Sequence, residues 1–164
     1  MDLLPTNAAH WHLVLNHLPV VGSLAALLLL AWAFIKNTDE SKRIGLTALV
    51  LVALVSIPAF LTGEPAEGPL KGLPGISKRW MSNHEEMAEV ALWVAVGAGA
   101  LALGVLLFFR KARPIPRWSI GGMVLVTLAV CALMGRTANY GGKISHPEIL
   151  SGAGAETAPT EIEH

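Results

Sequence analysis

The chain has 164 residues and a formal net charge of zero, with 53% hydrophobic and 15% charged residues. This composition is too apolar for a soluble domain of that length, and the balanced charge offers no basic patch of the kind that binds nucleic acid. The single cysteine excludes an intrachain disulfide. We therefore expect an integral membrane protein.

Four apolar segments predict membrane-spanning helices, because each is close to the roughly 20 residues that cross about 30 Å of hydrocarbon. Only a helix satisfies its own backbone hydrogen bonds in lipid. The predicted fold is all-α, an integral membrane four-helix bundle that forms one domain over residues 1–150, with spans at about 13–35, 44–62, 87–109 and 118–135. The segment 151–164 is rich in Gly, Ala, Thr and Glu, a composition typical of a disordered C-terminal tail.

The distribution of lysine and arginine predicts the orientation of the bundle. Seven of these residues lie in or beside the loops that follow the first and third spans, and five lie on the opposite side. Because positive residues collect in cytoplasmic loops, both termini and the loop at 63–86 are expected outside the cytoplasm. The predicted topology is therefore N-out and C-out.

Five of the six histidines fall on the outer side in this topology, namely His10, His12, His17, His84 and His146. A single imidazole at a membrane boundary is explained by its tolerance of the headgroup region. His17 is harder to explain in this way, because it lies several residues inside the apolar stretch, beside Asn16. Pro19 lacks an N–H and disfavours helical geometry at the preceding residue, so the helix should start or kink here. Irregular backbone at membrane depth normally lines protein or a cavity.

Acidic residues accompany the histidines at the second and third spans, namely Glu64, Glu67, Glu85, Glu86 and Glu89. Capping by Ser82 or Asn83 and the helix dipole account for the first acids of the third span. Glu89 stands one turn further into the apolar segment, where a carboxylate needs a polar partner. We expect that partner to be one of the nearby polar residues, namely His12, His17, Arg136, Tyr140 or His146.

Four elements occur in a fixed order between the apolar spans: "HLVLNHLPVVG", "TGEPAE", "NHEEMAE" and "TANYGGKISHPEI". In this combination, over about residues 10–150, the chain resembles a group of bacterial four-helix integral membrane proteins, some relatives of which are suspected b-type cytochromes. The resemblance implies that four histidines form one functional set, namely His12, His17, His84 and His146. We therefore expect the bacterial cytoplasmic (inner) membrane, and the predicted topology puts the histidine cluster on its periplasmic or extracellular side.

Three chemistries are compatible with this set. Haem iron takes neutral imidazoles as axial ligands, and a four-helix bundle offers an apolar slot for the porphyrin. Because the chain has no Cys-x-x-Cys-His motif, such a haem is bound non-covalently, with its propionates reaching toward Arg79, Arg136 or Lys143. Alternatively, histidines with carboxylates suit non-haem iron, zinc or copper. In the third case the polar groups form an interhelical network in a redox-inert anchor or assembly subunit.

We expect haem b, in one or two copies, with His17 and His84 as the central axial pair. The expected cofactor-binding set is His12, His17, His84, His146, Asn16, Arg79, Arg136 and Tyr140. The acids expected around it are Glu64, Glu67, Glu85 and Glu89. The expected role is electron transfer between the quinone pool and an extracytoplasmic partner such as a cytochrome, with the chain embedded in membrane lipid as a subunit of a larger redox complex. The sequence does not decide whether the protein is itself an enzyme.

Overall fold

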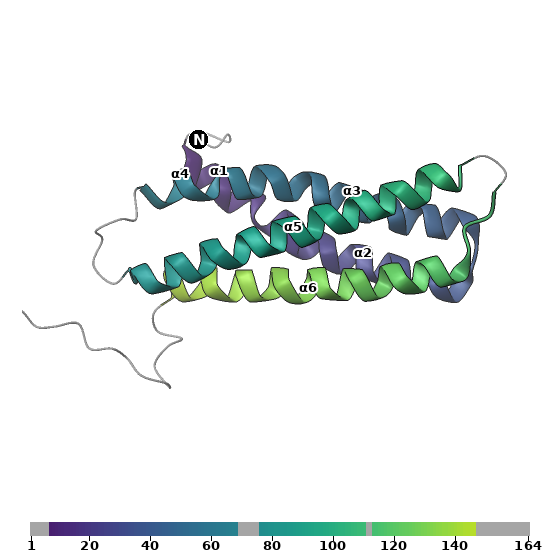
Figure 1. Ribbon diagram of the computed structural model, residues 1–164. Helices are drawn as coiled ribbons and strands as arrows, with labels where there is room; N and C mark the ends of the chain where they lie inside the picture. The colour runs from purple at the N-terminus through teal and green to yellow at the C-terminus, as the bar shows by residue number, and fades with distance from the viewer. Residues whose placement is uncertain (1–6, 69–75, 111–112, 147–164) are drawn as a thin grey trace, which may run out of the picture.

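The computed structural model describes residues 7–68, 76–110 and 113–146. These residues form six helices and no strand: α1 (Ala8–Leu15), α2 (His17–Lys36), α3 (Asp39–Leu61), α4 (Gly63–Glu67), α5 (Lys78–Phe108) and α6 (Arg117–Ser145) (Figure 1). Four helical segments are long and apolar enough to cross a membrane: α1 together with α2, then α3, α5 and α6. The all-α four-helix bundle is confirmed, and the chain is a multi-pass membrane protein. The predicted tail at 151–164 and His164 lie outside the described residues.

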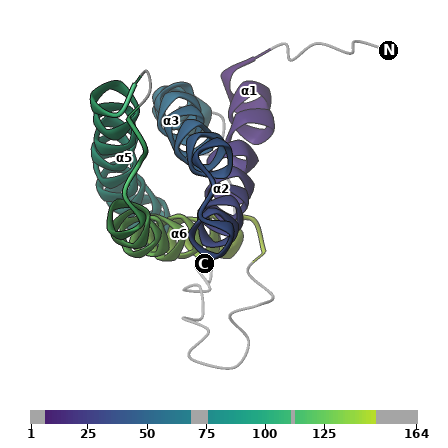
Figure 2. The same cartoon turned by 90° about the vertical axis from the view of Figure 1, so that its right-hand side faces the viewer.

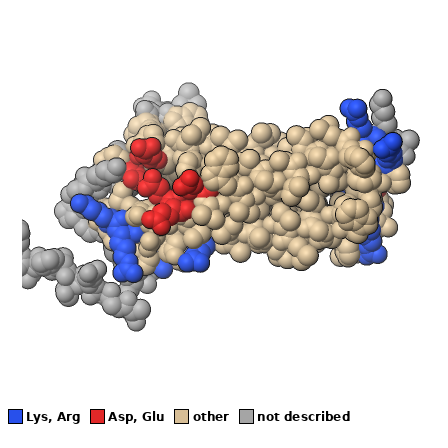
Figure 3. All heavy atoms as spheres, viewed as in Figure 1, with Lys and Arg blue, Asp and Glu red and all other residues tan. Residues whose placement is uncertain are grey.

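The four long helices run up and down and form a closed ring. In ring order they are α2, α3, α5 and α6, and α6 packs back against α2 (Figure 2). The start of α1 and the end of α6 therefore lie at the same end of the bundle (Figure 1). On the face that Figure 3 shows, charged side chains gather at the two ends, and the sequence places no charged residue in the middle of any of the four spans. This distribution is the one expected of helices that cross hydrocarbon.

From Ala91 onward, the side chains of α5 that face the axis of the bundle are all small, although three leucines of α2 and α3 are fully buried as well. Ala26, Ala95 and Ala102 are fully buried, whereas Trp93 and Leu125 are 65% and 69% exposed. Lipid is as apolar as a leucine side chain, so membrane helices gain most from close backbone approach rather than from burying large residues. Among the glycines that the structure describes, Gly99 of α5 makes the tightest contact, with Ala53 of α3.

The end of the bundle opposite the histidines is closed by two connections. Between α2 and α3, Asn37 adopts the left-handed conformation (φ 55°), and the side chain of Thr38 accepts a hydrogen bond from the N–H of Ser41. The side chain of the buried Lys42 donates to the carbonyl of Ile115 (2.6 Å), and Asp39 accepts from the N–H of the same residue (3.0 Å). The start of α3 thus holds the connection between α5 and α6.

At the histidine end, the first span is interrupted at Asn16, where α1 ends and α2 begins. This agrees with the break predicted from Pro19, which is buried in the first turn of α2. The interruption separates His12 from His17, so the two histidines belong to different helices.

The third span differs from the prediction at its start. Helix α5 begins at Lys78 after the N-cap Ser77, so Ser82 and Asn83 lie inside the helix instead of capping it. Its 31 residues measure about 46 Å at about 1.5 Å per residue, well beyond a hydrocarbon layer of about 30 Å. Nothing in the segment from Lys78 onward breaks a helix, so the polar first turns continue the apolar span out of the membrane.

Candidate functional site

Two histidines from different spans face each other at one end of the bundle. The rings of His12, on α1, and His84, on α5, have centroids 6.4 Å apart and planes at 88°. Both side chains are half-buried. Helices α2, which continues α1, and α5 lie on opposite sides of the ring of helices (Figure 2). The pair therefore spans the middle of the bundle end.

His12 is fixed by the end of α3. Its Nδ1 lies 3.1 Å from the carbonyl oxygen of Ala59 and 3.3 Å from the hydroxyl oxygen of Thr62. The hydroxyl of Thr62 donates its own hydrogen to the carbonyl of Ala59 or Pro58, so it acts as an acceptor toward the imidazole. The ring lies over Gly63, where an added Cβ would be 3.5 Å from its Cε1.

His84 is fixed by the end of α6 in the same manner. Its Nδ1 lies 2.9 Å from the carbonyl oxygen of Thr137. The ring lies over Gly141, where an added Cβ would be 3.3 Å from Cε1 and 3.4 Å from Nδ1. In both cases the glycine follows the carbonyl-bearing residue by four positions, and its missing side chain leaves room for the imidazole.

These hydrogen bonds determine which ring nitrogen remains available. A carbonyl oxygen only accepts, so Nδ1 of each imidazole must carry the hydrogen and donate it. The neutral ring then keeps its lone pair on Nε2, the nitrogen that can bind a metal. A metal-bound histidine usually donates its other ring N–H to a group such as a backbone carbonyl. This hydrogen bond orients the ring and makes it a better ligand.

The separation of the two rings matches one metal ion bound between them. A metal–nitrogen bond is about 2.0 Å, and a ring nitrogen is about 1.1 Å from the ring centre, so imidazoles on opposite sides of one ion have centroids about 6.2 Å apart. The observed distance is 6.4 Å. Two ligands at a tetrahedral angle would bring the centroids to about 5 Å. The spacing therefore favours ligands on opposite sides of the ion.

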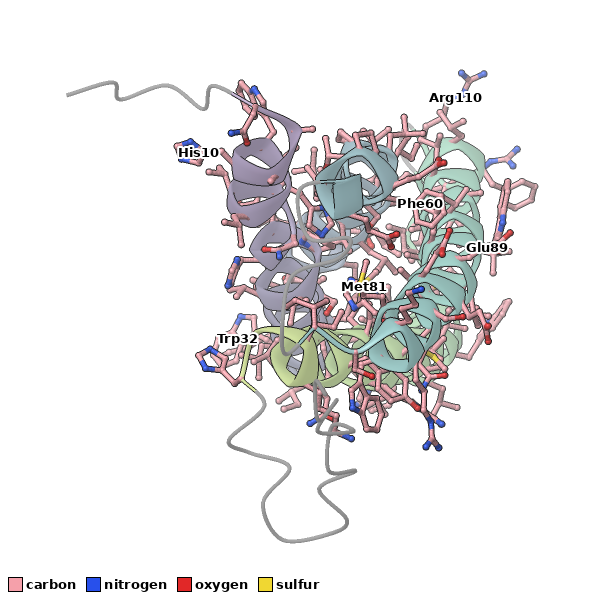
Figure 4. The ribbon with its side chains drawn as sticks, turned by 90° about the vertical axis from the view of Figure 1, so that its left-hand side faces the viewer. His10, Trp32, Phe60, Met81, Glu89 and Arg110 are labelled. Atoms are coloured by element: carbon pink, nitrogen blue, oxygen red, sulfur yellow. The ribbon has the colours of Figure 1, made fainter. Side chains whose placement is uncertain are left out.

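Three further groups lie at the same end of the bundle as the pair. Met81, three residues before His84, is buried and points toward the centre of the bundle end (Figure 4). Asn16 follows His12 by one helical turn, and its Oδ1 is buried with no hydrogen-bond partner in the described part of the chain. Glu67 of α4 lies close enough to His12 for its charge to act on the imidazole. The site thus has a sulfur atom, an unsatisfied amide oxygen and a carboxylate around it.

The other histidines have different positions. His17 is exposed, and its Nδ1 donates to the carbonyl of Leu13, which lies one helical turn earlier in the same span (3.0 Å). His10 is exposed and points away from the bundle (Figure 4), while the exposed His146 follows the last turn of α6. The structure brings His12 to His84, where the sequence led us to expect His17. On an ideal helix His12 and His17 diverge by about 140°, and the break at Asn16 does not turn them to the same side.

Most of the acids lie outside the pair. Glu64, Glu85 and Glu86 are exposed, and Glu86 accepts a hydrogen bond from Ser82 on the same helix. Glu89 is exposed and makes no hydrogen bond or ion pair with any residue that the structure describes, so the expected pairing is not seen. Helix α5 begins at Lys78, so Glu89 belongs to the polar first turns of this helix, and its exposed carboxylate needs no partner in the bundle.

The expected cationic residues surround two aromatic rings next to His84. Trp80 stacks on Tyr140, with centroids 5.9 Å apart. Lys143 lies 4.4 Å from the centre of the Trp80 ring, and Arg136 donates to the hydroxyl of Tyr140. Arg79 lies over Trp80 at 5.7 Å. Trp80 precedes His84 by one turn, and Tyr140 adjoins Gly141, so this basic-aromatic cluster borders the site on the side of α5 and α6.

Sequence reasoning missed the residues that hold the imidazoles. Gly63 and Gly141 occur where each hairpin returns to the histidine end, which is the only signal that could have singled them out. The two carbonyl groups leave no trace in the sequence. Over the ranges 7–68, 76–110 and 113–146, no three side chains of His, Cys, Asp or Glu come together as a group that could hold a metal ion.

Fold and site together define a multi-pass membrane four-helix bundle with an oriented imidazole pair between its spans. Comparisons with protein-family models, with curated proteins and with solved structures gave no match. The function is therefore argued from the geometry of the pair.

Proposed function

We propose that the protein is a b-type cytochrome-like membrane subunit that binds haem between His12 and His84. One observation carries this proposal. Two imidazoles from different spans lie 6.4 Å apart, and each donates Nδ1–H to a carbonyl. This arrangement leaves a neutral Nε2 on each ring, and the ring centroids are about as far apart as those of two axial imidazoles on one iron.

Haem needs only two ligands from the protein, because the porphyrin supplies the other four. Structural zinc takes four protein ligands and catalytic zinc takes three. His12 and His84 supply the two protein ligands that haem needs, which is fewer than a zinc site needs. Non-haem iron, zinc or copper stays the alternative cofactor, with Glu67 as the nearest carboxylate that could complete a site.

The basic-aromatic cluster supports the same cofactor. A haem that lies between the two imidazoles carries two propionates, which need cations near the polar end of the bundle. Arg79, Arg136 and Lys143 border His84, and none of them forms an ion pair with an acid among the described residues. These three side chains are the proposed partners of the propionates.

Electron transfer is the role that this position favours. His84 lies 24 residues before the end of α5 at Phe108, about 36 Å along the helix, which places the site close to one membrane face. A redox centre there is within reach of quinone in the bilayer and of a water-soluble cytochrome outside it. We assign the protein to the bacterial inner membrane, with this site on the periplasmic side and inside a larger complex.

Absorption spectra of the purified protein, oxidised and then reduced with dithionite, test the proposal. The native protein should show a Soret band and a reduced α-band, and His12→Ala and His84→Ala should each lose most of the bound haem. His17→Ala is the matched control, because His17 is exposed on the same span, and it should keep the haem.

A redox-inert anchor is the competing function, since the hydrogen bonds of His12 and His84 also tie α1 to α3 and α5 to α6. Native protein without a Soret band but with bound iron, zinc or copper would replace haem by the non-haem alternative. Native protein with neither haem nor metal would leave the anchor as the better reading.

A further inference from the structure

The two halves of the chain build the site in the same way. A step of 72 residues along the sequence takes His12 to His84, and a step of 78 residues takes Ala59 to Thr137 and Gly63 to Gly141. Each half therefore contributes a histidine near the start of its first long helical segment. Each also contributes a carbonyl and a glycine near the end of its second.

The same steps bring nine of the 13 buried residues of α2 and α3 onto buried residues of α5 and α6, and the other four onto half-buried ones. Between α2 and α5 they match Pro19 with Ala91, Ser23 with Ala95, Ala26 with Ala98, and Leu30 with Ala102. Between α3 and α6 they match Lys42 with Ile120, Gly45 with Met123, Leu49 with Thr127, Val52 with Val130, and Ser56 with Met134. The steps were fixed by hydrogen bonds to the histidines, so the agreement in burial is a separate observation.

The packing of the helices has the same symmetry. An exchange of α2 with α5 and of α3 with α6 leaves every neighbour in the ring unchanged, because each pair lies across the bundle (Figure 2). This is the exchange that a two-fold rotation about the long axis of the bundle would make. His12 and His84 exchange with each other and face each other near that axis.

The other histidines do not follow the symmetry. The 72-residue step takes His17 to Glu89, and the 78-residue step takes Gly68 to His146. His17 and Glu89 are both exposed, so the equivalent position in each half points away from the axis. The pair of His12 and His84 is the only histidine pair that the repeat generates within the described residues.

We propose that the bundle is an internal repeat of two helical hairpins, residues 8–68 and 78–146, and that it holds a single cofactor on the local two-fold axis. This inference rests on the proposed function for the identity of the cofactor, and it adds the number of cofactors and their coordination. The two-fold axis makes the two ligands equivalent, and the 6.4 Å between their ring centroids is about the separation of imidazoles on opposite sides of one ion. The iron of the single haem therefore has both axial positions filled, one by each half.

Filled axial positions restrict the chemistry of the site. A six-coordinate haem iron has no open position for oxygen, carbon monoxide or a substrate, so it can exchange electrons but cannot activate a ligand. The symmetry thus favours an electron carrier over an oxidase or a gas-binding protein. It also leaves His17 and His146 without a role as ligands of a second haem.

The test measures haem per chain and the coordination of the iron in the purified full-length protein. Pyridine haemochrome divided by protein from amino-acid analysis should give about one haem per chain, and the reduced spectrum should not change under carbon monoxide. His12→Gly and His84→Gly should each lose the six-coordinate spectrum, and added imidazole should restore it in both. Rescue by a free ligand separates loss of a ligand from failure to fold.

The outcomes distinguish the inference from the proposed function. Two haems per chain, or rapid carbon monoxide binding by the native protein, would overturn the inference and leave a haem protein. A haem that persists unchanged in either glycine variant would overturn it as well, since both halves must ligate. Absence of haem from the native protein would remove the proposed function and the single-haem site with it.

Discussion

The orientation of the His84 imidazole depends on one hydrogen bond and on the absence of a side chain at Gly141. His84 donates to the carbonyl of Thr137 at 2.9 Å, and its ring occupies the space that Gly141 leaves open. Gly141 is therefore selected by a close approach rather than by an unusual backbone conformation, because it lies inside α6. At the scale of residues, the proposed function is therefore sensitive to small changes in the position of the His84 ring.

We predict that Gly141→Ala lowers the affinity of the site for haem. The new methyl group would lie 3.3 Å from Cε1 of His84, closer than an ordinary contact, so the ring must move by a few tenths of an ångström. Such a movement weakens the bond to Thr137 and tilts the ligand. Changes to groups that orient metal-bound histidines lower affinity by about tenfold or more. The rate of haem transfer to apomyoglobin measures the effect.

Two other glycines, one next to Gly141 and one beneath His12, serve as controls for this variant. Gly142→Ala adds a methyl group with nothing within 4 Å and should match the native protein. Gly63→Ala makes an ordinary contact of 3.5 Å with His12 and should have a smaller effect than Gly141→Ala. Equal haem transfer from the Gly141 and Gly142 variants would show that the contact with His84 is not a constraint.

At the scale of elements, the sequence predicts the four spans well and the pairing of their side chains poorly. Hydropathy determines where a helix crosses a bilayer, so the apolar spans are found whatever their neighbours do. Which residue faces the axis depends on rotation about the helix. The break at Asn16 makes that rotation unpredictable, so His17 was expected where the structure has His12. The polar start of α5 was missed because hydropathy does not detect a helix outside the membrane.

We predict that Gly99→Ala weakens the packing of α5 against α3. Its methyl group would overlap the Cβ of Ala53, which cannot move aside unless the backbone of α3 shifts. Overpacking of this kind lowers stability by about 1–3 kcal/mol. Thermal unfolding in detergent, followed by circular dichroism, should show a lower midpoint. The double variant Ala53→Gly with Gly99→Ala removes the overlap and should recover much of the loss.

Gly97 provides a matched control on the same helix. A Cβ at this position meets nothing within 4 Å, and the residue is exposed. Gly97→Ala should therefore unfold at or slightly above the native midpoint, because alanine is the better helix former. If Gly97→Ala and Gly99→Ala unfold at the same temperature, close approach at Ala53 contributes little to the bundle.

At the scale of the whole molecule, the repeat explains why the histidines gather at one end. Each hairpin starts and finishes at the same end, so the start of one helical segment and the end of another always meet there (Figure 1). The other end is closed by the contacts of Lys42 and Asp39 with Ile115, and it has no counterpart of the imidazole pair within the described residues. The two ends of the bundle therefore differ from each other, although the proposed two-fold rotation about the long axis exchanges its two halves.

That polarity gives the two membrane faces different roles, and the orientation can be measured. Seven lysine and arginine residues flank the two connections at the end opposite the histidines, against five at the histidine end, so we predict that the histidine end is outside the cytoplasm. Alkaline phosphatase, which is active only outside, should be active when fused after residue 150 and inactive when fused at Thr38. Green fluorescent protein, which fluoresces only inside, should give the reverse pattern at the same two positions. Activity of alkaline phosphatase at Thr38 alone would move His12 and His84 to the cytoplasmic face, and an extracytoplasmic electron partner could then no longer reach the site.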